Sequence, residues 1–148
     1  MKYKKILIII IVLLLIPLFY FINNWNKNTS YLVTASSDSF ELDNGKLERT
    51  DGRGFDWILT GTIIPKKGIN WDSYDCTLFL PSPLHSTFEA KGKGKAILDY
   101  GLELTVPIYN SKSINKNEIK SLINKSYFKI NYLLNKKSFE EKIELHIE

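Results

Sequence analysis

The chain has 148 residues, with 20 lysine and arginine residues against 16 aspartate and glutamate residues, a formal net charge of +4 and one cysteine. A single cysteine excludes an internal disulfide framework, so a folded domain needs an apolar core. Three of the lysines, Lys2, Lys4 and Lys5, precede an apolar N-terminal segment, and without them the net charge is only +1. The rest of the chain therefore lacks the strongly basic character of nucleic-acid-binding domains, and no nucleic-acid partner is predicted.

The N-terminal segment is predicted to be a single-pass transmembrane helix of the signal-anchor type. No charged residue lies between Lys5 and Lys27, and about 20 helical residues cross a hydrocarbon core of roughly 30 Å. A cleaved signal peptide has an apolar region of only about 7 to 15 residues, followed by small residues. Bulky side chains fill residues 17–25 instead. Retention is favoured, and secretion after cleavage is the alternative.

The lysines before this segment set its predicted orientation, because positive charge stays on the cytoplasmic side of a membrane. We expect a cytoplasmic stretch at 1–5, the anchor at 6–25, a short linker at 26–30 and an extracytoplasmic domain at 31–148. Trp25 suits the outer membrane interface. The predicted location is thus the cell membrane, with the C-terminal domain outside the cell.

Alternating apolar and polar residues dominate the domain and predict β-strands. The expected strands are 31–35, 39–42, 55–64, 74–80, 96–106, 128–134 and 139–147. Turns are expected at Asp43-Asn44-Gly45, at residues 81–83 and at 135–138, and the strand 96–106 is expected to end at Pro107. Strands at this spacing favour an all-β, mainly antiparallel fold, and the architecture predicted is an immunoglobulin-like β-sandwich.

One short helix is predicted before the C-terminal hairpin. Asn115 and Glu118 have the spacing of a capping box, and Ile119, Leu122 and Ile123 follow at helical spacing. Two or three turns are not stable alone, so this helix should pack against an end or edge of the sheet.

No catalytic, cofactor-binding or metal-binding pattern is present, and an enzyme is not expected. His85 lies near two serines but without the G-x-S-x-G elbow of a serine hydrolase. His85 and His146 are far apart for a zinc site, and Asp72 and Asp75 lack the spacing of a calcium loop. Cys76 alternates with polar residues and is expected to be a buried structural thiol.

Two groups of residues are candidates for partner contact. Trp71 and Tyr74 lie close together in a polar stretch, and aromatic side chains often anchor interfaces. Lys91, Lys93 and Lys95 alternate with glycines, and they protect a strand edge or contact anionic lipid headgroups or wall polymer.

The predicted function is a membrane-anchored extracytoplasmic binding or accessory module whose ligand the sequence does not identify. The candidate partners are an envelope protein and an anionic wall or lipid component. The alternative is an immunity or exclusion factor that acts at the outer face of the membrane. A small envelope hydrolase is the least favoured interpretation.

Overall fold

The computed structural model describes residues 13–18, 29–50, 55–66, 72–93, 101–110 and 114–148. Residues 13–18 are helical and lie inside the predicted anchor, whereas the rest of that segment is outside the described residues. Among the described residues, no helix has the length and apolar character needed to cross a membrane. The anchor therefore stays a prediction.

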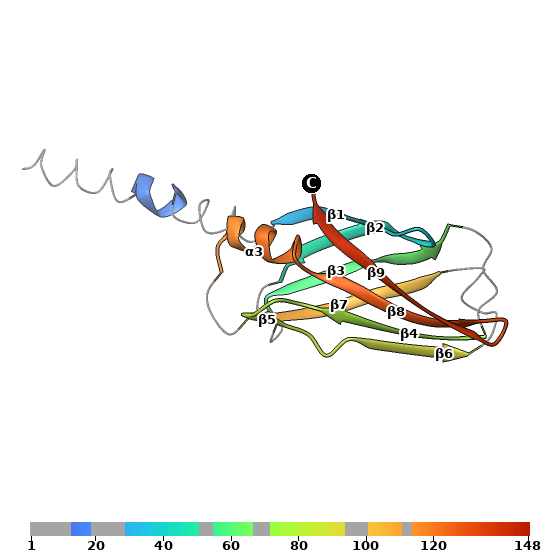
Figure 1. The fold of residues 1–148 in the computed structure, drawn as a ribbon. Coiled ribbons are helices and arrows are strands. Elements are labelled where there is room, and N and C mark those ends of the chain that lie inside the picture. Colours follow the sequence, from blue (N-terminus) through green and yellow to red (C-terminus); the bar gives the residue numbers. More distant parts are fainter. Residues whose placement is uncertain (1–12, 19–28, 51–54, 67–71, 94–100, 111–113) are drawn as a thin grey trace, which may run out of the picture.

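The other described residues form a β-rich domain with one helix (Figure 1). In chain order its elements are β1 (Ser30–Ser36), β2 (Phe40–Arg49), β3 (Trp57–Pro65), β4 (Ser73–Phe79), β5 (Leu84–His85), β6 (Glu89–Lys93), β7 (Leu102–Asn110), α3 (Lys116–Ile123), β8 (Tyr127–Leu134) and β9 (Lys137–Ile147).

Within the described part of the chain, the strands form one nine-stranded sheet in the order β5-β7-β3-β2-β1-β9-β8-β4-β6. Every pairing is antiparallel. The prediction of a mainly antiparallel all-β fold is confirmed. The continuous strand order does not by itself show the two separate sheets of an immunoglobulin-like sandwich.

The sheet curls so that its two halves face each other. Phe40 on β2 and Tyr132 on β8 are separated by β1 and β9 in the strand order, which is roughly 14 Å in a flat sheet at about 4.8 Å for each step. Their ring centroids are nevertheless 5.5 Å apart in an edge-to-face arrangement. The apolar faces of the two halves therefore meet in one core.

The core consists of the inward-facing residues of these strands together with two residues of α3. Its largest fully buried side chains are Phe40, Phe128, Leu47, Leu59, Ile63, Ile108, Ile119, Ile123, Ile130, Ile143, Leu145 and Val33. Ile119 and Ile123 belong to α3, which covers the end of the sheet where β1 begins (Figure 1). The predicted helix is confirmed, and the Asn115 side chain caps it by accepting hydrogen bonds from the backbone N–H groups of Asn117 and Glu118.

The turn predicted at Asp43-Asn44-Gly45 is wrong, because β2 continues through these residues to Arg49. The pairing registers of β2 shift between Asp43 and Lys46, and Asn44 has a φ of 51°. The three residues therefore form an irregularity inside a long strand, for which the same residue types are suited. Gly45 is required there, since an added Cβ would lie 2.1 Å from the carbonyl oxygen of Val33.

The strand end predicted at Pro107 is also wrong, since β7 runs from Leu102 to Asn110. Pro107 pairs with Ile58 of β3, whereas on the other side of β7 the described residues pair only at Tyr109 and Asn110, with the short β5. Proline has no backbone N–H, so it is tolerated in a strand where that side has no neighbouring strand that needs a donor. Residues 96–100 of the predicted strand lie outside the described residues.

The predicted C-terminal hairpin is confirmed. Strands β8 and β9 pair along their whole length up to Leu134 and Lys137, and both turn residues, Asn135 and Lys136, have positive φ angles. Positive φ at both central positions is the geometry of a two-residue type I′ turn.

The domain has two opposite ends along the strand direction. At the entry end the chain enters β1, where the N–H of Arg49 donates to the carbonyl of Thr29 at 2.9 Å. The opposite end, the hairpin end, contains the turn between β8 and β9. From the registers of β1 with β9 and of β9 with β8, Ser30 and Ser138 lie on the order of 40 Å apart along the strands, at about 3.3 Å for each position.

Candidate functional site

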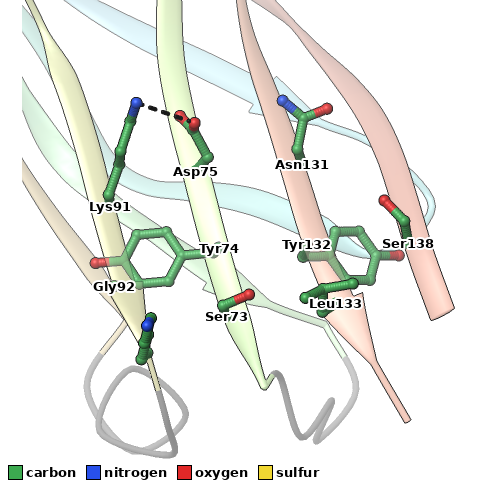
Figure 2. A pocket seen from close by; sticks show the side chains of 10 residues that line it. Ser73, Tyr74, Asp75, Lys91, Gly92, Asn131, Tyr132, Leu133 and Ser138 are labelled. Atoms are coloured by element: carbon green, nitrogen blue, oxygen red, sulfur yellow. Dashed lines mark ion pairs between the residues drawn. The ribbon is translucent and has the colours of Figure 1, made fainter. Parts of the chain in front are cut away.

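A groove of about 440 Å³ lies at the hairpin end, across β6, β4, β8 and β9 (Figure 2). Most of its lining side chains are on the side of the sheet that faces away from the core. Its lining residues are Ser73, Tyr74, Asp75, Lys91, Gly92, Lys93, Asn131, Tyr132, Leu133 and Ser138.

The groove brings together three of the residues predicted to contact a partner. Tyr74 on β4 lies opposite Gly92 on β6, and Lys91 and Lys93 flank that glycine. Trp71 and Lys95, the other two predicted residues, lie outside the described residues. Two separate stretches of sequence thus contribute to one surface because β4 and β6 are paired.

Tyr74 lies across its neighbouring strand because that strand has a glycine at the opposing position. Figure 2 shows the Tyr74 ring extending over β6 at Gly92. A Cβ added to Gly92 would be 2.1 Å from Cε1 of Tyr74. An aromatic ring packed over a cross-strand glycine supplies the contact that glycine lacks. This pair therefore forms both a structural contact and one wall of the groove.

The positive charge of Lys91 is balanced inside the groove. Its Nζ lies 3.3 Å from the carboxylate of Asp75 and 3.6 Å from that of Glu89. Asp75, by hydrogen bonding and by charge, and then Glu89 raise the pKa of Lys91. Both partners are exposed, so the pairs contribute little to stability, but they weaken the attraction of Lys91 for an external anion.

The groove is supported from behind by a carboxylate that the sequence did not single out. Glu141 on β9 accepts hydrogen bonds from the hydroxyls of Tyr132 at 3.0 Å and Ser37 at 2.6 Å, and from the N–H of Ser39 at 3.3 Å. Partial burial alone would raise the pKa of Glu141, but these hydrogen bonds outweigh it and the pKa lies below its usual value. Glu141 therefore connects Tyr132 to the chain between β1 and β2.

A signal for Glu141 was present in the sequence. Alternation along β9 places it on the same side as Phe139 and the buried Ile143. A charged residue at an inward position needs partners to be tolerated, so this break in the pattern marked a polar network.

The groove presents polar, charged and apolar side chains. Ser73, Asn131 and Ser138 supply neutral donors and acceptors. Tyr74 and Tyr132 line the groove from the core-facing side; Tyr132 is only 6% exposed, whereas Tyr74 is partly exposed. Burial raises the pKa of both phenols above the ordinary value of 10.0, and both are neutral at physiological pH. A partly exposed aromatic ring and the exposed Leu133 beside uncharged hydrogen-bonding groups suit a polar ligand or a protein surface.

Of the residues considered for catalysis or metal binding, Asp75 lines this groove, and the two histidines lie elsewhere. His85 is exposed and stacks on Tyr109, with ring centroids 5.4 Å apart. In the part of the chain that the structure describes, no group of three or more His, Cys, Asp or Glu residues is placed to hold a metal ion. Cys76 is buried as predicted, and burial raises its thiol pKa to about 12.

A second cavity, of about 540 Å³, lies at the entry end between the end of β2 and the start of α3. Its lining residues are Arg49, Trp57, Ile114, Asn115, Lys116 and Asn117. Trp57 is only 3% exposed and stacks on Tyr31, so it joins the cavity to the core. The described residues that line this cavity include two cations and no carboxylate.

Comparisons with protein-family models, with curated proteins and with solved structures gave no match to this chain. The function has to be inferred from the two surfaces themselves.

Proposed function

We propose that the chain is a membrane-anchored extracytoplasmic binding or accessory module, and that the groove at the hairpin end contacts its partner. The observation that carries this proposal is the position of the groove, on the order of 40 Å along the strands from the point where the chain enters the domain. A domain held by residues 6–25 presents that end to the space outside the membrane.

The tether explains how a shallow groove is useful. Confining both partners to the envelope raises their effective concentration, so modest affinity is sufficient. The groove has the features of such a contact, since the partly exposed Tyr74 ring and the exposed Leu133 lie beside several neutral polar groups.

The chemistry of the groove favours an envelope protein or a largely uncharged polymer over a strongly anionic one. Lys91 already has Asp75 and Glu89 as partners. Lys93 also lines the groove, but beside Asp75 the net positive charge is small. The groove is not proposed to contact lipid headgroups, because the hairpin end points away from the predicted anchor.

The sandwich architecture belongs to the same proposal. Its support is the packing of the two halves of the curled sheet across the core, where Phe40 meets Tyr132. An immunoglobulin-like domain of this kind presents residues from several strands at each end, as both cavities here require.

Site-specific photocrosslinking in intact cells tests the proposal. A photoreactive amino acid at Ser138, in the groove, is expected to give one discrete product with an envelope component. The same amino acid at the exposed Glu103 of β7, which does not line the groove, is the matched control. The product should be lost with Tyr74→Ala. Equal products at both positions, or a yield unaffected by Tyr74→Ala, would contradict the proposal.

The immunity or exclusion factor is the second candidate, and the same experiment separates it. Its product at Ser138 would form only when the incoming toxin or phage is added, whereas an accessory module gives its product in unchallenged cells.

A further inference from the structure

We infer that the entry-end cavity binds the anionic headgroups of phospholipids in the membrane that holds the anchor, and that this contact sets the orientation of the domain. The inference rests on the proposed membrane anchor. It concerns Arg49 and Lys116, neither of which was a candidate in the sequence.

The first argument is distance along the chain. Arg49 is hydrogen-bonded through its N–H to Thr29, and Trp25 is predicted to lie at the outer membrane interface. Four residues reach at most about 14 Å when fully extended. The side chain of Arg49 is therefore held within reach of the headgroup region, whatever the path of the linker.

The second argument is charge. Arg49 and Lys116 are both exposed and line the same cavity, together with the amide side chains of Asn115 and Asn117. Glu48, the neighbour of Arg49 on β2, is already paired with Lys46 at 2.5 Å. Two like charges beside one cavity with no carboxylate in its described lining favour an anionic ligand.

The third argument is the form of the site. The guanidinium of arginine and the ammonium of lysine are the side chains that bind phosphate oxygens most strongly. Buried Trp57 gives the cavity a rigid apolar floor. A phosphodiester headgroup fits these requirements, and the adjoining bilayer supplies it at high local concentration.

The inference can be tested with the full chain in lipid nanodiscs. A fluorescent donor is attached at Ser121→Cys on the exposed side of α3, outside the cavity, and acceptors are placed on lipid headgroups. Cys76 is buried and will not compete for the label. Nanodiscs contain either phosphatidylcholine alone or phosphatidylcholine with about 30% of the anionic lipid phosphatidylglycerol.

The expected result is higher energy transfer with phosphatidylglycerol than without it. The variant Arg49→Glu with Lys116→Glu should reduce the transfer to the phosphatidylcholine value, and Arg49→Gln with Lys116→Gln should reduce it partly. The control, Lys136→Glu with Lys137→Glu, makes the same change of charge at the hairpin end but outside the groove, and it should leave the transfer unchanged. Circular dichroism checks that each variant is folded.

The outcomes separate the inference from the proposed function. The headgroup site is wrong, and the anchor stands, if the chain is incorporated into the nanodiscs but energy transfer is the same in both lipids. The same holds if the control variant lowers energy transfer as much as the cavity variant. If the chain does not float with the nanodiscs, the anchor is wrong and the inference falls with it.

Discussion

The cavities at the two ends of the domain differ in how their charged and aromatic side chains are held. At the hairpin end, Lys91 is paired with Asp75 across two strands, and Tyr74 lies half-buried over a glycine. At the entry end, Arg49 and Lys116 line a cavity whose described residues include no carboxylate, and Trp57 belongs to the core. The groove at the hairpin end is therefore nearly neutral, and its Tyr74 ring can change position. The cavity at the entry end is cationic, and its Trp57 ring is fixed in the core.

This difference matches what the two ends would face. A nearly neutral, aromatic groove suits a partner recognised by shape and hydrogen bonds. A cationic cavity beside the predicted anchor suits a surface whose common feature is negative charge. The comparison also predicts that changes at the two ends have unequal costs in stability.

The largest expected effect is on the aromatic residue at the entry end. Trp57→Ala removes a fully packed side chain and should lower the free energy of unfolding by about 3 to 5 kcal/mol. Tyr74→Ala removes a half-buried ring and should cost about 1 to 2 kcal/mol. Urea unfolding of the full chain in detergent, followed by circular dichroism, measures both. Equal costs would contradict the contrast between the two ends.

A smaller effect is expected at Gly92. In Gly92→Ala the new Cβ displaces the Tyr74 ring, and because a ring can rotate away, the cost in stability should be only about 1 kcal/mol. The photocrosslinked product at Ser138 should nevertheless fall severalfold, since the groove loses one wall. A Gly92→Ala variant with an unchanged crosslinking yield would show that Tyr74 does not shape the binding surface.

The carboxylate behind the groove makes part of the stability depend on pH. Because the folded pKa of Glu141 lies below its ordinary value of 4.5, its stabilising effect is complete above pH 4.5 and is lost as the pH falls through the folded pKa. Glu141→Gln should therefore cost about 1 kcal/mol at pH 7, with a smaller difference from the unchanged chain at pH 3. Urea unfolding at both pH values tests this, and a difference that is constant with pH would contradict it.

The smallest effect on stability is expected for the ion pair between Lys91 and Asp75 in the groove. Lys91→Met should leave the urea midpoint unchanged within error, since exposed ion pairs contribute little. A clear loss of stability would mean that the groove is held together by charge, contrary to the comparison.

Local patterns in the sequence predicted more of the fold than of the site. Alternation located most strands because one side of each strand is buried, and Asn115 located α3 because its cap is a contact between near neighbours. The irregularity at Asn44 was mistaken for a turn because both features use the same residue types. Pro107 was read as a strand end because the sequence does not show which side of a strand is unpaired.

The site depended on contacts between distant residues. Tyr74 and Lys91 were each selected from their own stretch, but the pairing of β4 with β6 decides that they form one surface. Arg49 and Lys116 were missed because neither is unusual until α3 is placed at the end of β2. The alternation around Glu141 carried a signal, but its donors, Ser37 and Ser39, come from the other end of the domain sequence.

The central claim is that the domain is held outside the cell with its hairpin end away from the membrane. The most direct test compares Ser138→Cys and Ser121→Cys in intact cells, treated with a bulky maleimide that does not cross membranes. Ser138→Cys should react as fast in cells as in detergent-solubilised protein, whereas Ser121→Cys on α3 should be slowed severalfold by the nearby bilayer. Two results would contradict the account. One is a Ser138→Cys that reacts only after cell lysis, and the other is a Ser138→Cys that is slowed more in cells than Ser121→Cys.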